Sequence, residues 1–599
     1  MKDFIDTIKD FPDILRHAFK LFRDSYKQSK VIFSGYLILS LILTFVPYFR
    51  NFIQGLLINN LQGSLTITSE FKLLFALFIG IITIPSFLEI LRNFFDKTNY
   101  FKVSQFYENE LVRKSIEIDP QLHENKDFNN LKNRISGKGI YTIPNFQEYF
   151  IMFSLDLLTL ILTAVTLYHF TKLGFLILIV TTIPVLIIKI VYGQSSWYIW
   201  GNDTDTEKRS KYWEYKTYFE NFSSYIELKI TEAKEYFKKY RSDFLKEVFE
   251  KKFKNEKQFT SKSFWTTIIS QAGIVYIIYS LFVKVLSNEL PVGSFIFAIS
   301  LVTTFTVTFV SLFSNLGKMY PDYRYVKDFF DFMKVESIVK NTGTQTLNEV
   351  PPTIEFKNIF FKYPGTDTYV LKNFNLTIEK GDKIAVIGLN GAGKTTFVKL
   401  LCRFYDPTEG EILLNGINIK EYDLEEWYKN LGVLFQEYGK YHIPLEDLVS
   451  LGRHAKTIDH KKVKNSLQKA EADFVNTLPY KEKTQLGKQY TDGVDISVGQ
   501  WQKLAIGRMF YRDPAVMILD EPTSSIDAEA EAKIFETLEK LSKDKTVIMI
   551  SHRFSTVRNA NKICVIKDAK LHEYGTHEEL MVNNDEYARL FTLQAEGYK

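Results

Sequence analysis

A glycine-rich run in the second half of the chain has the residue types and spacing to hold phosphate. Its order is Gly388-Leu389-Asn390-Gly391-Ala392-Gly393-Lys394-Thr395-Thr396. The apolar run Ile384–Ile387 precedes it and the helix-like Phe397–Leu401 follows it. A buried strand, glycines that let backbone N–H groups close on oxygen atoms, and a helix N-terminus together favour a phosphate anion. We expect Lys394 to reach the β- and γ-phosphates and the Thr395 hydroxyl to coordinate Mg²⁺.

Two adjacent acids end another apolar run, Val516–Leu519. Asp520 can hold the Mg²⁺ shell, and Glu521 can orient or deprotonate an attacking water. Between the glycine-rich run and these acids lies Ser497-Val498-Gly499-Gln500, at the start of an expected helix. A helix N-terminus with a serine hydroxyl is a further set of donors for a phosphate. These elements together predict a site that hydrolyses ATP with Mg²⁺.

Three more features complete a pattern that resembles the ATP-binding cassette (ABC) family over residues 353–599. They are Gln436 after Val433–Phe435, the turn Ser525–Asp527, and His552 after the apolar run Thr546–Ile550. The resemblance implies that Gln436 contacts Mg²⁺ and the attacking water. It also implies that Glu521 is the general base and that His552 holds the γ-phosphate and the water.

The same resemblance assigns the remaining contacts of the expected site. The residues expected to bind ATP are Tyr363, on which adenine would stack, the loop 388–396, Ser497, Gly499, Gln500 and Asp527. The expected Mg²⁺ ligands are Thr395, Gln436 and Asp520. In this family the serine and glycines of the signature motif, here Ser497 and Gly499, meet the ATP that the opposite subunit holds.

The chain departs from the usual family pattern in two places. Val498 replaces a glycine and Ile496 replaces a leucine in the signature, so we expect a working motif with altered ATP affinity. Many exporters have a Glu-Arg-containing loop before the signature, whereas this chain has Thr484–Gly493. Together with Trp501–Lys503, this loop resembles a subgroup that includes exporters of bacterial peptides.

Composition bounds the architecture but not the partners. At 599 residues the chain is too long for one core and invites at least two domains. Apolar residues make up 46%, yet the mean hydropathy is only −0.10, as expected when an apolar half lies beside a polar half. We expect no nucleic-acid partner. The two cysteines, Cys402 and Cys564, are expected to be core thiols, and no disulfide framework or Cys-rich metal site is indicated.

Six apolar stretches precede residue 353, each near or above the length that crosses a bilayer. They are Val31–Phe49, Leu73–Leu88, Leu157–Thr171, Leu173–Ile188, Ser263–Val283 and Leu290–Gly317. The spacers after the first, third and fifth are short, whereas residues 92–148 and 189–262 are long and rich in Lys and Arg. The positive-inside bias therefore predicts a multi-pass protein of the inner (plasma) membrane. Its long spacers, both termini and the nucleotide-binding domain would lie in the cytoplasm.

The expected fold class is an α-helical six-span membrane domain followed by an α/β P-loop nucleotide-binding domain. Its expected parts are an interfacial helix at 1–30, the membrane domain at 31–333, a linker at 334–352 and the nucleotide-binding domain at 353–599. The turning points of the long spacers, Asp127–Ile135 and Tyr218–Leu228, should dock on the nucleotide-binding domain, as they do in ABC exporters. Within the spans, Asp156 is expected to face either a substrate cavity or a partner on another helix.

These features predict an ATP hydrolase coupled to export, a translocase that works as a homodimer with ATP sites shared between its subunits. The expected cargo is a peptide-like or amphipathic compound, with a lipid flippase or multidrug exporter as the alternative. An ATP-regulated channel is disfavoured because a gate needs no catalytic base, and an importer because importers usually keep spans and cassette on separate chains. The spans exclude a soluble cassette protein. No cleavable signal and no cysteine-protease segment precede the spans, so we expect no leader-peptide cleavage by this chain.

Overall fold

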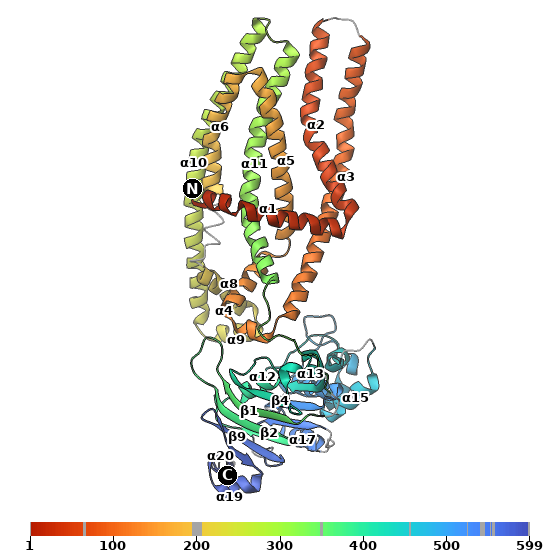
Figure 1. Ribbon diagram of the computed structural model, residues 1–599, viewed down its shortest axis with the longest axis vertical. Helices are drawn as coiled ribbons and strands as arrows, with labels where there is room; N and C mark the ends of the chain where they lie inside the picture. The colour runs from red at the N-terminus through yellow and green to blue at the C-terminus, as the bar shows by residue number, and fades with distance from the viewer. Residues whose placement is uncertain are drawn as a thin grey trace. The chain divides into compact units, whose positions relative to one another are not determined.

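The computed structural model describes residues 2–63, 68–193, 206–347, 351–453, 457–523, 525–539, 545–551, 553 and 557–596. These residues form two compact units (Figure 1). The helical unit comprises Met1–Ile118 and Asn125–Glu336, and the nucleotide unit comprises Asp119–Glu124 and Ser337–Lys599. A short piece of the first long spacer therefore belongs to the nucleotide unit.

Six helices in the described part of the helical unit are long and apolar enough to cross a membrane, as predicted. They are α2 (Lys30–Gly63), α3 (Ser69–Glu117), α5 (Thr142–Phe170), α6 (Lys172–Gly193), α10 (Ala233–Leu286) and α11 (Val292–Met333). The most apolar window of α3 buries none of its residues, and Leu73, Phe87 and Ile90 are 62%, 69% and 67% exposed. An outer surface this apolar over such a length suits lipid rather than water.

Four shorter helices accompany them among the described residues: α1 (Lys2–Gln28), α4 (Lys126–Lys138), α8 (Thr206–Glu220) and α9 (Phe222–Ile230). Helix α1 runs across the long helices of its unit (Figure 1). Its Ile14, Ala18 and Leu21 side chains are fully buried, and Tyr107 Oη donates a hydrogen bond to Asp24 at 2.9 Å. One apolar face of α1 therefore packs against the other helices of its unit.

Asp156 pairs with another helix of the helical unit. Its Oδ2 accepts hydrogen bonds from Ser311 Oγ and Asn315 Nδ2, both at 2.8 Å. Asp156 lies on α5 and both donors lie on α11. Of the two surroundings that the sequence left open, the structure therefore shows the interhelical partner.

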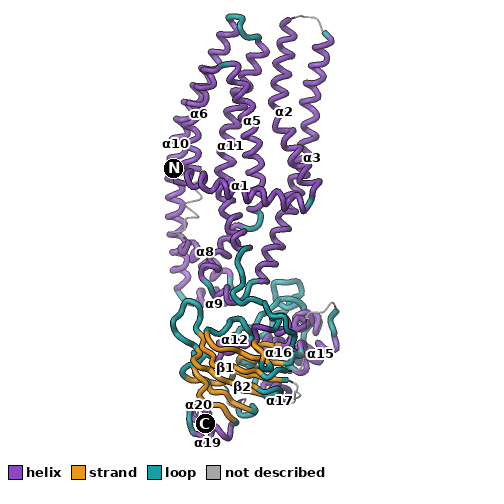
Figure 2. The backbone as a smooth tube through the Cα atoms, in the orientation of Figure 1, coloured by secondary structure: helices purple, strands orange, loops and turns teal. Residues whose placement is uncertain are grey.

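The nucleotide unit contains two β-sheets in its described residues (Figure 2). The larger has six strands in the order β10-β9-β3-β8-β7-β6, and the smaller has four in the order β2-β1-β4-β5. The bounds are β1 (Ile354–Phe361), β2 (Leu371–Ile378), β3 (Lys383–Ile387), β4 (Glu409–Leu414), β5 (Ile417–Asn418), β6 (Leu431–Leu434), β7 (Val516–Asp520), β8 (Thr546–Ile550), β9 (Lys562–Lys567) and β10 (Lys570–Gly575). Strands β6, β7, β8, β3 and β9 pair in parallel, and β10 is antiparallel to β9. Parallel strands are buried on both faces, which explains the continuous apolar runs in the sequence.

Helices cover these sheets and connect their strands. Those described are α12 (Lys394–Leu401), α13 (Leu424–Asn430), α14 (Leu445–Ser450), α15 (His460–Lys469), α16 (Val498–Arg512), α17 (Ala528–Glu539), α19 (His577–Asn583) and α20 (Glu586–Glu596). Cys402 and Cys564 are free and buried, as predicted. The carboxyl ends of β3, β6, β7 and β8 lie at one edge of the sheet, where ligands bind in open α/β folds.

A short stretch of the first spacer, just before its predicted turning point, groups with the nucleotide unit, and the docking of the two turning points stays a prediction. Asp127–Ile135 and Tyr218–Leu228 both belong to the helical unit, whereas Asp119–Glu124 belongs to the nucleotide unit and contains the single turn η1 (Pro120–Glu124). Asp119 Oδ2 accepts hydrogen bonds from the N–H groups of Ile338 and Val339. Apolar periodicity could locate a helix turn nearby, but it carries no information on such side-chain-to-backbone pairs.

Candidate nucleotide-binding site

The phosphate loop lies between β3 and α12. Gly391 and Gly393 have φ values of 80° and 107°, which glycine adopts with little strain. A Cβ atom at Gly393 would meet the carbonyl oxygen of Val370 at 3.0 Å. Helix α12 begins at Lys394, so its unpaired N–H groups adjoin the loop. The local backbone is therefore suited to close on an anion.

Lys394 is folded into the loop. Its side chain is 8% exposed, and Nζ donates to the backbone oxygens of Gly388 at 2.7 Å and Leu389 at 3.1 Å. Burial lowers the pKa of Lys394, while Glu521 and Asp520 oppose that effect. Phosphate oxygens carry more negative charge than these carbonyl groups, so they would be stronger acceptors for the same ammonium.

Asp520 and Glu521, at the end of β7, concentrate negative charge at the sheet edge. Asp520 is 4% exposed, and its burial together with the adjacent Glu521 raises the pKa of Asp520 to about 6, against the opposing effect of Lys394. The Thr395 side chain is exposed at the start of α12. Oxygen ligands of this kind suit Mg²⁺, and a divalent cation would stabilise the crowded carboxylates. The residues present therefore fit the metal that the sequence predicts.

Glu521 has a strained backbone that its surroundings hold in place. Its φ is 50°, and its N–H donates to Ile550 O at 3.0 Å. Gln436 Nε2 donates to Glu521 Oε2 at 3.4 Å, so the predicted water-binding glutamine and the predicted base are in contact. Positive φ in a residue other than glycine is uncommon, and such strain concentrates at functional sites.

Gln502 is a supporting residue that the sequence analysis missed. It is 3% exposed on α16, its Nε2 donates to Glu521 O at 3.2 Å, and its Oε1 accepts the N–H of Ser525 at 3.0 Å. It thus connects the signature helix to the backbone of the expected base. The only signal in the sequence was one amide among the apolar residues on the inner side of that helix.

The residue predicted to stack on adenine lies beside the phosphate-loop helix. The Tyr363 hydroxyl and Thr396 Oγ1 are 3.0 Å apart, and the Tyr363 ring packs edge-on against Phe361 and Tyr405. Tyr363 also lines a cavity of about 510 Å³ within the nucleotide unit. Adjoining residues of that cavity wall include Gln121 of the first spacer. Tyr363 therefore borders a space next to the expected phosphate site.

The signature residues form a capped helix start. Ser497 Oγ accepts the N–H of Gln500 at 3.2 Å, and Gln500 Oε1 accepts the N–H of Ser497 at 2.8 Å. A Cβ at Gly499 would meet Ser525 O at 2.4 Å, so glycine is required there. Val498 is the first residue of α16 and is 55% exposed. Its helical backbone suits any residue, which explains how valine fits where the family usually has glycine.

Asp527, predicted to belong to the ATP-binding set, ends the turn Ser525–Asp527 and immediately precedes α17. Its Oδ1 accepts the N–H of Ala530 at 2.8 Å, and its Oδ2 lies 3.4 Å from Lys503 Nζ. The structure thus brings Lys394, Asp520, Glu521 and Gln436 together at one sheet edge, and it links α16 to that edge through Gln502. His552, predicted after β8, lies outside the described residues.

Comparison with known proteins extends over both units. Residues 371–524 match the ABC transporter family model. The chain is 28% identical over 581 residues to the subtilin transport ATP-binding protein of Bacillus subtilis, covering 96% of this chain and 93% of that protein. It is also 28% identical to the nisin transport ATP-binding protein of Lactococcus lactis subsp. lactis, over 98% of this chain and 97% of that one.

A solved structure of a bacterial Atm1-family ABC exporter with ATP bound has a similar fold. Its TM-score is 0.74 at 20% sequence identity, with 93% of this chain and 98% of that chain covered. The six-span unit followed by an α/β nucleotide unit agrees with that fold and confirms the predicted fold class. The described residues therefore place an ABC transporter domain behind six membrane-capable helices, with the fold of an ABC exporter and with relatives named for transport, and this combination indicates ATP hydrolysis coupled to transport.

Proposed function

We propose that the chain exports a peptide-like or amphipathic compound across the cytoplasmic membrane, as a homodimer driven by hydrolysis of ATP with Mg²⁺. The observation that carries the hydrolytic part is the contact of Gln436 with Glu521, beside Asp520 and Lys394 at one sheet edge. A domain that only bound ATP would need the lysine and the phosphate loop, but not a base in contact with a water-orienting amide.

In the proposed reaction, the loop 388–396 holds the phosphates and Glu521 accepts a proton from the attacking water that Gln436 orients. Thr395, Gln436 and Asp520 would hold Mg²⁺, which when bound neutralises phosphate charge. Tyr363 is proposed to support the adenine, and His552 to contact the γ-phosphate. Lys394 would move from its carbonyl acceptors, Gly388 and Leu389, onto phosphate oxygens.

The domain content of one chain supports the proposed homodimer. Within its described residues, a single chain has six membrane-capable helices and one nucleotide unit, and its signature residues lie at the exposed start of α16. We propose that Ser497, Gly499 and Gln500 complete the ATP site of a second copy, with Asp527 nearby. We also propose the division into 1–30, 31–333, 334–352 and 353–599, with both termini and the nucleotide-binding domain in the cytoplasm.

The proposed class of cargo is supported by what the similar proteins are named for transporting. The proteins matched along nearly their full length are named for transport of subtilin and of nisin, which supports a peptide cargo. Shorter matches include a putative multidrug export ATP-binding/permease protein of Staphylococcus aureus, 36% identical over 44% of this chain and 45% of that protein. Amphipathic drugs and lipids therefore remain the alternative cargo in the test below.

The direct test uses inside-out membrane vesicles that contain the protein. They should accumulate labelled peptide when ATP and Mg²⁺ are added, but not with a non-hydrolysable ATP analogue. Nisin, subtilin, a lipophilic dye and a fluorescent phospholipid should be compared in parallel, with Glu521→Gln vesicles as the control. Uptake of dye or phospholipid alone would replace the peptide proposal, and ATP-driven loss of cargo from the lumen would reverse the proposed direction.

A further inference from the structure

Three side chains of the types that can hold a metal ion lie close together near the C-terminal end of the nucleotide unit. His572 and Glu573 lie on β10, and Asp585 immediately precedes α20. One ligand atom from each of the three lies within 4.8 Å of the others. His572 Nε2 and Asp585 Oδ2 are 3.0 Å apart. None of these residues belongs to the set proposed for ATP or Mg²⁺.

A β-bulge brings the two neighbouring residues of β10 to the same place. Adjacent residues in a regular strand point to opposite faces, so His572 and Glu573 would normally diverge. Here Leu571 pairs with Ile566 and Glu573 pairs with Val565, so β10 has one extra residue against β9. Bulges re-aim side chains in this way. The irregular strand is therefore the reason that an imidazole and a carboxylate can approach a common point.

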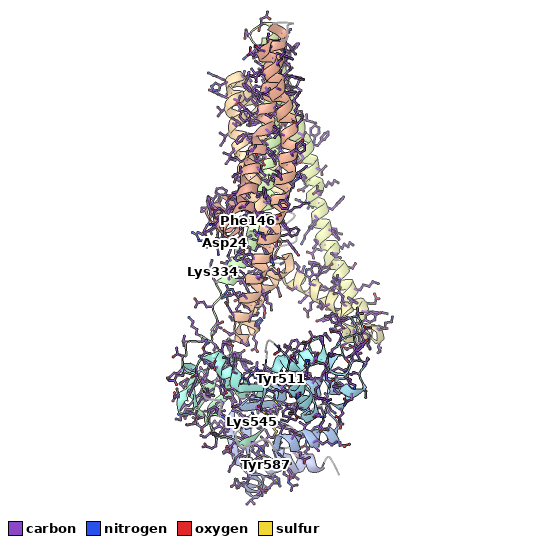
Figure 3. The ribbon with its side chains drawn as sticks, turned by 90° about the vertical axis from the view of Figure 1, so that its right-hand side faces the viewer. Asp24, Phe146, Lys334, Tyr511, Lys545 and Tyr587 are labelled. Atoms are coloured by element: carbon purple, nitrogen blue, oxygen red, sulfur yellow. The ribbon has the colours of Figure 1, made fainter. Side chains whose placement is uncertain are left out.

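One carboxylate oxygen of Glu573 is buried without a hydrogen-bond donor among the described residues. Glu573 is 9% exposed, and its Oε2 accepts the N–H of Tyr587 at 2.8 Å. Tyr587 is labelled in Figure 3. The other carboxylate oxygen, Glu573 Oε1, is buried and has no hydrogen-bond partner within the part of the chain that the structure describes. A buried carboxylate oxygen without a donor is costly, and a bound cation would remove that cost.

We propose that His572, Glu573 and Asp585 bind one divalent transition-metal cation of the zinc class. Two ligands of one tetrahedral Zn²⁺, each at about 2.0–2.1 Å, lie roughly 3.3 Å apart. The 3.0 Å separation of His572 Nε2 and Asp585 Oδ2 is within a few tenths of an ångström of this distance. An imidazole nitrogen favours Zn²⁺ over Mg²⁺ or Ca²⁺, and water would fill the remaining position. The ion would join β10 to the start of α20.

The chain offers a matched control for the simpler alternative, a histidine–carboxylate ion pair without metal. His460 Nδ1 and Glu446 Oε2 are 2.9 Å apart in the same unit, and that pair has no third ligand among the described residues. If proximity of an imidazole to a carboxylate were sufficient, both places would bind Zn²⁺ equally. The buried Oε1 of Glu573 predicts that only the three-residue group does.

Calorimetric titration of the full-length protein with Zn²⁺ tests this proposal. The protein should be purified without a histidine tag, treated with a chelator and kept free of nucleotide. His572→Ala and Asp585→Asn should each weaken Zn²⁺ binding by at least about tenfold, while His460→Ala should leave it unchanged. Glu521→Gln should also leave it unchanged, which separates this site from the ATP site. X-ray absorption of the zinc-loaded protein should show nitrogen and oxygen ligands that include an imidazole.

A separate measurement without zinc checks that the two variants are folded. His572→Ala and Asp585→Asn should retain the ATPase rate of the unmodified protein in the presence of a zinc chelator, so that lost binding is not due to unfolding. Zn²⁺ binding that is unchanged in both folded variants would overturn the proposal. The proposal would also be overturned if the unmodified protein bound no Zn²⁺ in the titration.

Discussion

The Nζ atom of Lys399 donates a hydrogen bond to Glu124 Oε1 at 2.7 Å. Lys399 lies on α12, the helix that begins at the phosphate loop, and its Nζ is 5.2 Å from the centre of the Tyr363 ring. Glu124 also accepts a hydrogen bond from Tyr405. The short segment that follows α3 in the chain therefore contacts the phosphate-loop helix α12 through Lys399, which also lies beside the Tyr363 ring.

We expect Glu124→Gln to reduce the amount of cargo moved per ATP hydrolysed. The change keeps the size of the side chain but removes the charge that attracts Lys399. The two side chains are 52% and 25% exposed, so the ion pair stabilises the fold by only about 0–1 kcal/mol. ATP binding and basal ATPase rate should persist. Transport and hydrolysis should be measured together in vesicles.

The control for this variant is Glu117→Gln, at the end of α3, where the glutamate pairs with Arg113 on the same helix. Loss of one such intrahelical pair should not alter coupling. Equal transport-to-hydrolysis ratios in Glu124→Gln, Glu117→Gln and unmodified vesicles would show that the Lys399 contact has no part in coupling.

Glu521→Gln should lower ATP hydrolysis by about 10²-fold or more while ATP still binds, because the amide is not a base. The variant keeps an oxygen that can accept from Gln436, so the local contacts should persist. ATPase rate and nucleotide affinity are the measurements. Glu437→Gln, which changes the exposed acid next to Gln436, is the control. Hydrolysis at the unmodified rate in Glu521→Gln would exclude this glutamate as the base.

The parts of this architecture that are local in the chain could be predicted from the sequence. Runs such as Val31–Phe49 and Val516–Leu519 consist largely of consecutive apolar residues, which indicate a membrane span or a buried strand directly. The glycines near Lys394 mark the loop between strand and helix. Contacts between distant segments left no such signal. Glu124 and Lys399 are 275 positions apart, and the preference of Asp119–Glu124 for the nucleotide unit depends on pairs of this kind. Asp156 had two open interpretations until its partners on α11 were located.

Both native thiols should be unreactive in the folded protein. Burial raises the pKa of Cys402 to about 12 and also raises the pKa of Cys564, so almost no thiolate exists at pH 8. We expect maleimide to label neither residue under native conditions and both after denaturation, as counted by mass spectrometry. Rapid native labelling of either cysteine would contradict the core packing described for the nucleotide unit.

Asp156→Asn should be tolerated much better than Asp156→Leu. Asparagine retains an oxygen that can accept from Ser311 and Asn315, whereas leucine leaves both donors without that partner. An unsatisfied polar group in such a place costs about 1–3 kcal/mol. The thermal unfolding midpoint in detergent should therefore fall for Asp156→Leu and stay near the unmodified value for Asp156→Asn. The reverse order, or a loss of transport by Asp156→Asn with normal stability, would favour a role of the charge in the substrate cavity.

Two inactive variants should complement each other if the chain works as the proposed homodimer. Lys394→Ala removes the phosphate-binding lysine, and Ser497→Arg fills the exposed start of α16. In a mixed dimer, one ATP site receives both changes and the other receives neither. Isolated mixed dimers should therefore show up to about half of the unmodified ATPase rate.

The two variants should be co-expressed with different affinity tags, and mixed dimers should be isolated on both tags in sequence. Each variant alone, prepared in the same way, gives the background rate. Ser497 also caps α16, so the thermal midpoint of Ser497→Arg must be checked against that of Ser497→Ala, which loses the same cap without adding bulk. Stable mixed dimers that remain inactive would show that the signature of one copy does not serve the ATP site of the other.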